Sequence, residues 1–290
     1  MGTGRAWTGW IWWQTWAGSL GPMTPHSPAE VAAQYATDRH LQTRIETHER
    51  YGSGPDLEPE VDRRLALLGD EALLDVGTGP GHFPGRLRAE GHRGRLAGVD
   101  LSPGMVERAR ALHPGVEFVG ASADALPFPD ASFDVLTARH MLYHVPDIAA
   151  ALAEFARVLK PGGRFLAVTN AAGYMSELWD VVAEVVPDEP ALAGLLESRA
   201  GSAVFSEVNG EELVRGAFGN VHLDFLDSAL VFPEPGPVLA YLESMTALQR
   251  LPEEGRARIR AVLERTLAPL FHAGEWRVSK RVAFIRATKR

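Results

Sequence analysis

The chain has 290 residues, of which 46% are apolar and 23% are charged, as is typical of a globular protein with a substantial core. Its formal net charge of -8 gives no basic excess that would drive general binding to nucleic acid. The sequence has no cysteine, which excludes disulfides, thiolate metal sites and cysteine nucleophiles and suits a cytoplasmic enzyme.

The first segment is rich in tryptophan and glycine and runs to Gly21-Pro22. Its apolar part is too short to span a bilayer, although tryptophans can lie at a membrane interface. We interpret residues 1–24 as a disordered Trp-rich tail, with an upstream extension before Met23 as a related alternative.

Two helices are expected next. Ser27 suits a helix N-cap, and Pro28 suits the first helical position of a helix that reaches about Arg50. A second helix over 57–68 is indicated by apolar residues on one face, namely Leu57, Val61, Leu65 and Leu68.

Short apolar runs then alternate with helical patterns. This rhythm predicts a parallel sheet that is covered by helices on both faces. From residue 173 the rhythm changes to helices alone, and two further strands follow residue 218. The five alternating strands are expected at 72–76, 95–99, 116–119, 133–137 and 164–169, and the last two at 221–232 and 276–287.

A glycine-rich turn follows the first of these strands. The apolar run carries Asp75, and Gly77, Gly79 and Gly81 follow at alternate positions. Such a turn at the carboxyl end of a strand is a ligand-binding element, and it suggests either a dinucleotide or S-adenosylmethionine. The dinucleotide spacing G-x-G-x-x-G is absent, because no glycine stands three positions after the second glycine in either register. No Gly-Lys-Ser/Thr follows, so the P-loop pattern fails as well.

Several motifs occur in the order found in one known family. Beyond the glycine turn they are Asp100, Asp124-Ala-Leu-Pro-Phe, Phe133-Asp-Val-Leu, His144-Val-Pro-Asp and Arg157-Val-Leu-Lys-Pro-Gly-Gly163. The chain resembles a class I S-adenosylmethionine-dependent methyltransferase of the type 11-like group that acts on small metabolites. The resemblance is close over residues 72–169 and looser over 200–288.

The resemblance implies an α/β fold, Rossmann-like and doubly wound. Its mostly parallel sheet is expected to have seven strands with the last antiparallel. A helical lid would cover residues 25–70, and a helical insertion over 173–217, between strands five and six, would line the substrate site. Residues 71–172 and 218–290 would form the core that binds the cofactor.

The resemblance also implies how S-adenosylmethionine is bound. Asp100 would accept the ribose hydroxyls, and Asp124 would receive the adenine amino group. Asp75 would attract the ammonium of the methionine part. The other expected contacts are Gly77, Thr78, Gly79, Gly81, Leu101, Met105, Ala123, Ala125 and the carbonyl of Ala138. The residues alone leave alternatives, since Asp100 could cap a helix and Asp124 could belong to a simple turn.

Candidate catalytic residues follow the fourth strand. Methyl transfer needs a general base only if the acceptor atom is protonated. His140 is a candidate for that base or an ordinary loop histidine. His144 is a second candidate, although its motif is so general in the group that a structural role is the alternative. No metal is expected.

The acceptor is expected to contact side chains near this loop and in the insertion, namely Arg139, Tyr143, Tyr174, Met175 and Trp179, of which the apolar ones could equally be core. Four polar residues of the first helix, Tyr35, His40, Arg44 and His48, could face the site or form a solvated surface.

The final segment is basic, and we interpret it as a solvated edge strand protected by its charges, with contact to phosphate as the alternative. The sequence thus predicts an enzyme that methylates an O, N or C atom of a small molecule in the cytoplasm. An RNA or protein methyltransferase and a non-catalytic S-adenosylmethionine-binding module are the alternatives.

Overall fold

The computed structural model describes residues 38–199 and 204–290. The tryptophan-rich tail, the predicted cap at Ser27 and the candidate Tyr35 lie outside the described residues. The described part of the first predicted helix is α3 (Asp38–Tyr51), which ends one residue beyond the predicted end at about Arg50.

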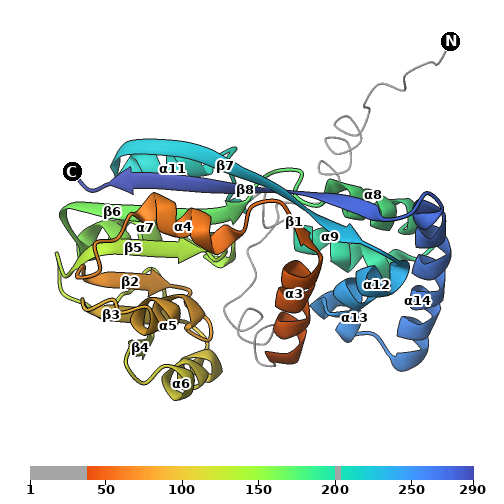
Figure 1. The fold of residues 1–290 in the computed structure, drawn as a ribbon, viewed down its shortest axis with the longest axis horizontal. Helices are drawn as coiled ribbons and strands as arrows, with labels where there is room; N and C mark the ends of the chain where they lie inside the picture. The colour runs from red at the N-terminus through yellow and green to blue at the C-terminus, as the bar shows by residue number, and fades with distance from the viewer. Residues whose placement is uncertain (1–37, 200–203) are drawn as a thin grey trace, which may run out of the picture.

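A single mixed sheet organises the described chain (Figure 1). Its strand order is β1-β7-β8-β6-β5-β2-β3-β4. The strands from β4 to β6 pair in parallel, and β8 is antiparallel to both of its neighbours, β6 and β7. The strands are β1 (Gly52–Ser53), β2 (Leu73–Val76), β3 (Leu96–Asp100), β4 (Glu117–Gly120), β5 (Phe133–Arg139), β6 (Leu159–Asn170), β7 (Gly219–Phe232) and β8 (Trp276–Thr288).

This arrangement confirms the predicted fold class, including the antiparallel last strand. The expected sheet of seven strands has one more member, since β1 pairs with Leu230 and Ala229 of β7. β1 consists of only Gly52 and Ser53, and a segment of two residues is too short to show the alternation of a strand. Its pairing with β7 could therefore not be predicted from the sequence.

Helices cover both faces of the sheet, as the alternation predicted. Neighbouring residues of a strand point to opposite faces. In β2, Leu73 packs with α4, α5 and α6, whereas Leu74 packs in the cluster that contains α7 and α11. The helices are α4 (Leu57–Leu65), α5 (His82–Ala89), α6 (Pro103–Leu112), α7 (Ile148–Val158) and α11 (Gly210–Ala217).

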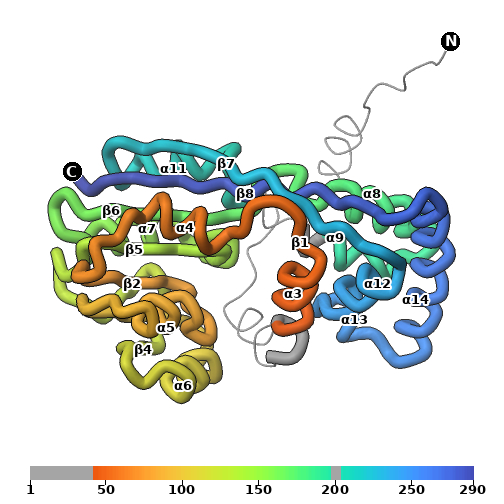
Figure 2. The backbone as a smooth tube through the Cα atoms, viewed as in Figure 1, coloured from red at the N-terminus to blue at the C-terminus, as the bar shows by residue number. Residues whose placement is uncertain are grey.

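A third group of helices packs on the far ends of the two long strands β7 and β8 (Figure 2). Its apolar core includes Leu230 and Phe232 of β7 and Val278 of β8. α3 lies between this group and the rest of the sheet and contacts α12 and β7. The group contains α8 (Ser176–Val185), η2 (Pro190–Leu192), α9 (Ala193–Arg199), α12 (Pro235–Glu243), α13 (Thr246–Gln249), α14 (Glu253–Leu267) and η3 (Ala268–Phe271).

Three predicted details of the elements are wrong. α4 ends at Leu65, because Ala66 takes a left-handed conformation, and the side chain of Leu68 is 83% exposed. The fifth predicted strand starts earlier than residue 164, because β6 begins at Leu159 and the backbone of Gly162 and Gly163 pairs with Lys289. The last strand is no edge strand, because β8 lies between β6 and β7.

The charges of β8 are partly paired within the sheet. Arg281 forms an ion pair with Asp227 of β7 at 2.6 Å, and Arg286 pairs with Asp224 at 3.2 Å. The cations of β8 are therefore not uniformly solvated. Arg281 and Arg286 form ion pairs on the sheet, and Lys280 lines a cavity.

Candidate functional site

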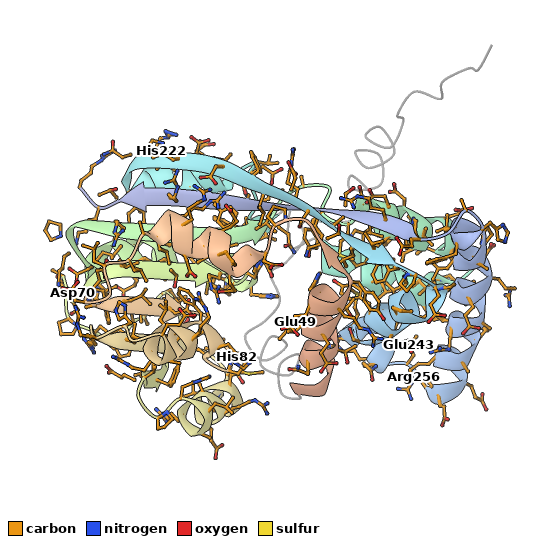
Figure 3. All side chains as sticks on the ribbon, in the orientation of Figure 1. Glu49, Asp70, His82, His222, Glu243 and Arg256 are labelled. Atoms are coloured by element: carbon orange, nitrogen blue, oxygen red, sulfur yellow. The ribbon has the colours of Figure 1, made fainter. Side chains whose placement is uncertain are left out.

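A cavity of about 1000 Å³ opens at the carboxyl ends of β2, β3 and β5. One wall is the glycine turn with the starts of α5 and α6, and the other is α3 with the 52–59 segment and parts of β7 and β8. Glu49 of α3 and His82 of α5 lie on these facing walls (Figure 3). Its volume is at the upper end for small-molecule sites, which leaves room for two ligands together.

The three glycines of the turn all have positive φ angles, but they differ in the space around them. At Gly77 and Gly81, with φ of 70° and 77°, an added Cβ would come within 2.6 Å of Met141 and 2.5 Å of the Phe118 ring. At Gly79, with φ of 55°, a Cβ would meet nothing within 4 Å. Gly77 and Gly79 line the cavity, whereas Gly81 packs behind it. Gly79 therefore offers its backbone to open space where a ligand can approach closely.

Asp100 at the end of β3 holds this turn in place. Its Oδ2 accepts a hydrogen bond from the backbone N–H of Gly79 at 2.8 Å, and its Oδ1 accepts one from Ser102 N–H at 2.8 Å. Burial raises the pKa of the carboxyl group. Ser102 is the N-cap of α6, and its Oγ accepts from Met105 N–H at 3.5 Å. The capping role that competed for Asp100 thus belongs to Ser102, and Asp100 lines the cavity.

The remaining residues predicted for the cofactor divide into two groups. Thr78, Leu101, Met105, Ala123 and Asp124 line the cavity with the glycine turn. A second group, consisting of Asp75, Gly81, Ala125 and Ala138, does not line it.

Asp75 lies beneath the turn. Its side chain is 3% exposed, and its Oδ1 accepts a hydrogen bond from Thr137 Oγ1 at 2.6 Å. Burial raises the pKa of this carboxyl group, against the opposing effect of nearby Arg139. Asp75 is therefore placed to affect the site through the turn and through Thr137, and its contact with a bound ammonium stays a prediction.

The end of β5 and the loop that follows it bring all four predicted residues to the cavity, namely Arg139, His140, Tyr143 and His144. His140 has a left-handed backbone, with φ of 51°, and its N–H donates to the carbonyl of Val168 at 2.8 Å. Burial, together with Arg139 and Lys280, lowers the pKa of its imidazole to about 4. His140 is therefore neutral near pH 7, which is the form that can accept a proton.

Arg139 ties two walls of the cavity together. Its Nη1 donates to Glu58 Oε1 of α4 at 2.7 Å, and its guanidinium lies 4.1 Å from the centre of the Phe83 ring of α5. The sequence predicted Arg139 near the acceptor, and the structure shows that its charge already has a carboxylate partner.

Only one of the three residues predicted from the insertion lines the cavity. Tyr174 lines it, whereas Met175 and Trp179 are 0% and 5% exposed and belong to the apolar cluster of α8, α12 and α14. Tyr241 donates a hydrogen bond to the Met175 sulfur at 3.6 Å, and Trp179 Nε1 donates to the carbonyl of Tyr174. The expected lining role of Met175 and Trp179 is therefore wrong, and their helical spacing reflects core packing.

α3 contributes more to the site than its sequence indicated. Arg44 and His48 both line the cavity, so the solvated face that competed with this placement does not apply to them. The His48 ring meets Tyr241 edge-on at 5.8 Å, and burial, with Lys280 as the next cause, lowers its pKa to about 3. The side chain of His40 lies outside the described side chains.

Lys280 of β8 is the main cavity residue that sequence reasoning missed. Its neighbours on the same face of the strand, Val278 and Val282, are buried. This alternation was the available signal, because a lysine in an apolar row of a strand is out of pattern. Because other basic residues surround Lys280 in the sequence, the segment was interpreted as a solvated strand.

Two features are absent from the part of the chain that the structure describes. There, no group of three or more histidine, aspartate and glutamate side chains lies close enough to hold a metal ion. No helix in the same part of the chain combines the length and apolar character needed to cross a membrane.

The comparisons with known proteins agree with this geometry. Residues 74–167, from β2 to β6, match the family model described as a methyltransferase domain. This stretch is therefore similar in sequence to a methyltransferase domain over about a third of the chain. The turn, Asp100 and the loop after β5 all lie within this stretch, whereas α3 and Lys280 lie outside it.

Similar proteins include methyltransferases with different acceptors. The chain is 35% identical to malonyl-[acyl-carrier protein] O-methyltransferase of Serratia marcescens over 47% of this chain and 54% of that one. It is 46% identical to the ubiquinone/menaquinone biosynthesis C-methyltransferase UbiE of Brucella anthropi over 32% and 38%. The chain spans about half the length of the curated relatives it matches.

The crystal structure of the YcgJ protein from Bacillus subtilis has a similar fold. It superposes with a TM-score of 0.52 at 22% identity, over 80% of this chain and 97% of that one. This likeness extends beyond the matched domain and confirms the predicted fold.

Proposed function

We propose that the protein is an S-adenosylmethionine-dependent methyltransferase that methylates a small molecule at an O, N or C atom. The observation that carries the proposal is the space above Gly79, where a positive-φ turn held by Asp100 faces a cavity and lies within the stretch that matches a methyltransferase domain. A lining of this kind suits a cofactor with vicinal hydroxyls and an aminoacyl group.

The cofactor would lie along the wall formed by β2 and β3. Asp100 would accept hydrogen bonds from the ribose hydroxyls, and Leu101 and Met105 would pack against the adenine with Asp124 at its edge. The turn at Gly77 and Gly79 would receive the aminoacyl end. The bound cofactor supplies a methyl group that its sulfonium has already activated.

The acceptor would occupy the remaining space below α3. Tyr143 and Tyr174 line that space with His140, close to the carboxyl end of β5. The chain's task is to align the acceptor atom and to exclude water. His140, which is neutral near pH 7, would accept the proton if the acceptor atom carries one. His144 would shape the same wall.

Two segments outside the matched domain would complete the site. Residues 25–70 would act as a helical lid, a role supported by Arg44 and His48 in the cavity wall. Residues 173–217 would contribute Tyr174, although α11 packs against α7 and β7 of the sheet. The cavity is enclosed from several sides, which supports a small acceptor, and the cysteine-free composition supports a cytoplasmic enzyme.

Calorimetry and methyl transfer test the proposal together. S-adenosylhomocysteine, the demethylated product, should bind the whole chain, and tritiated methyl from S-adenosylmethionine should reach a member of a panel of small phenols, amines, carboxylic acids and activated carbon acids. Absence of binding would refute the cofactor assignment. Binding without transfer to any of a broad panel would favour a non-catalytic module.

A further inference from the structure

Lys280 occupies a position that the fold would otherwise give to an apolar residue. It shares a face of β8 with Val278, Val282 and Phe284, which are 0%, 5% and 0% exposed, while Ser279 on the opposite face is exposed. Val282 and Lys280 both line the cavity. A partly buried ammonium costs desolvation free energy, so its presence in this row needs a compensating interaction.

No such interaction exists within the described residues. Lys280 forms no ion pair with any carboxylate of the described chain. Burial lowers its pKa, and Asp56, at longer range, opposes this effect. Asp56 therefore offsets only part of the cost of burying the ammonium.

A second cation, Arg44, lies at the same end of the cavity as Lys280. Arg44 of α3 lines the same cavity and makes one hydrogen bond, from Nη1 to the carbonyl of Ser244 at 2.9 Å. His48 and His140 are close enough for Lys280 to lower the pKa of both rings. At this end of the cavity Lys280 and Arg44 are the lining cations and Glu49 and Asp56 are the lining acids, while Glu58 is already paired with Arg139.

The position of β8 separates Lys280 from the glycine turn. In the sheet, β5 and β6 lie between β2 and β8. With neighbouring strands about 4.8 Å apart, β8 lies roughly 14 Å from the strand that carries the turn. An aminoacyl group held at Gly77 and Gly79 therefore ends well short of Lys280, and the space between them belongs to the acceptor.

We propose that Lys280 binds a carboxylate of the methyl acceptor, with Arg44 adding to the field and Tyr143, Tyr174 and Tyr241 enclosing an apolar body. The inference rests on the proposed function and specifies its substrate class as a small organic acid with an aromatic or similarly apolar body. A negative group here would also balance the positive sulfonium in the same cavity.

Matched pairs of carboxylates and amides test this inference. Benzoate, 1-naphthoate and 4-biphenylcarboxylate would each be titrated, beside the corresponding neutral amide, into protein saturated with S-adenosylhomocysteine. The wild type, Lys280→Met and Lys160→Met would be compared by calorimetry. Lys160 is the matched control, because it pairs with Asp134 at the start of β5 and does not line the cavity.

At least one carboxylate should bind the wild type and Lys160→Met about tenfold or more tightly than its amide. In Lys280→Met that preference should fall below about threefold, while the affinity for S-adenosylhomocysteine stays within about threefold of wild type. Met keeps the length of the side chain and removes the buried charge, so the variant should unfold at the same or a higher temperature.

Three outcomes would overturn the inference. They are equal binding of every carboxylate and its amide, a preference that survives Lys280→Met, and a tenfold loss of S-adenosylhomocysteine affinity in Lys280→Met. The last would assign the lysine to the carboxylate of the cofactor. If S-adenosylhomocysteine fails to bind the wild type, the proposed function itself is wrong, so the two failures are distinguishable.

Discussion

The two walls of the cavity are built in different ways. On the glycine-turn wall, the geometry is set by hydrogen bonds of Asp100 with Ser102, 2 residues away in the chain, and with Gly79, 21 residues away. On the facing wall, Arg44, His48 and Lys280 come from α3 and β8, more than two hundred residues apart. Their cationic and imidazole groups lack carboxylate partners in the described chain, apart from the longer-range effect of Asp56 on Lys280.

This difference indicates which wall suits the cofactor and which wall suits the acceptor. Backbone donors and a carboxylate fixed by two N–H groups form a site that exists before the ligand arrives. Partly buried cations without a carboxylate partner can gain one from a bound ligand. The first wall suits a cofactor shared by many enzymes, and the second suits an acceptor particular to this one.

The largest expected effect concerns His140, where the walls meet. His140→Asn should lower kcat about 100- to 10,000-fold with a proton-bearing acceptor, because the base is lost. Asparagine is chosen because it tolerates the left-handed backbone at this position. Steady-state kinetics with the acceptor found in the panel would measure this, and S-adenosylhomocysteine affinity should change less than about threefold. A wild-type kcat would remove His140 as the base.

A pair of glycine substitutions separates packing from binding on the first wall. Gly81→Ala should lower the free energy of unfolding by about 2–4 kcal/mol, since its Cβ would come within 2.5 Å of the Phe118 ring at a φ of 77°. Gly79→Ala should cost only about 1 kcal/mol of stability but should greatly weaken S-adenosylhomocysteine binding. Urea unfolding and calorimetry would show both, and equal stability losses in the two variants would contradict the assignment.

Asp100→Ala should weaken S-adenosylhomocysteine binding by about 1–3 kcal/mol, the range for losing hydrogen bonds to a charged group. Calorimetry at constant pH measures the change. Asp130→Ala is the control, because the Asp130 side chain is 79% exposed and pairs with Arg157 away from the cavity. Unchanged affinity in Asp100→Ala would refute the ribose role.

The smallest expected effect is the pH dependence of stability from His48. Its pKa is about 3 in the folded chain against an ordinary value of 6.5, so the unfolded chain binds the proton more readily below pH 6.5. Stability is therefore lost as pH falls from about 6.5 toward 3. Arg44, His140 and Lys280 all face this ring and favour its neutral form.

His48→Gln should remove about 1–2 kcal/mol of the stability loss between pH 7 and pH 5, after allowance for solvent screening. Urea unfolding at both pH values measures this difference. His222→Gln, at an exposed histidine of β7 (Figure 3), should leave the loss unchanged. The prediction fails if His48→Gln and the wild type lose stability equally.

Much of the fold and of the first wall could be predicted from the sequence because their signals are local. The strand that ends at Asp100 follows the glycine turn by about twenty residues, and parallel neighbours place their carboxyl ends together. The sequence could not show which residues of the motif line the cavity and which pack behind the turn. Asp75 and Gly81 belong to the same motif as Gly79, yet they pack beneath and behind the turn.

The second wall could not be predicted because it depends on the order of strands that are distant in sequence. The alternation along β8 places Lys280 on the same face as Val278 and Val282, but only the placement of β8 between β6 and β7 shows which elements that face meets. Met175 and Trp179 were misassigned for a related reason, since an apolar residue on a helix has the same spacing whether it faces a ligand or another helix.

The pairing of β8 on both edges limits how the side chain that it presents to the cavity can change between related proteins. Lys280 lies opposite Ser228 of β7, and further along the strand Val282 lies opposite Leu226 of β7 and Asn170 of β6. Because side chains alternate, a slip of one residue would turn Lys280 outward and present Ser279 or Arg281 to the cavity instead. A strand held on both edges resists such a slip. The chemistry offered to an acceptor can therefore change by substitution at position 280 more easily than by insertion in the loop that precedes β8.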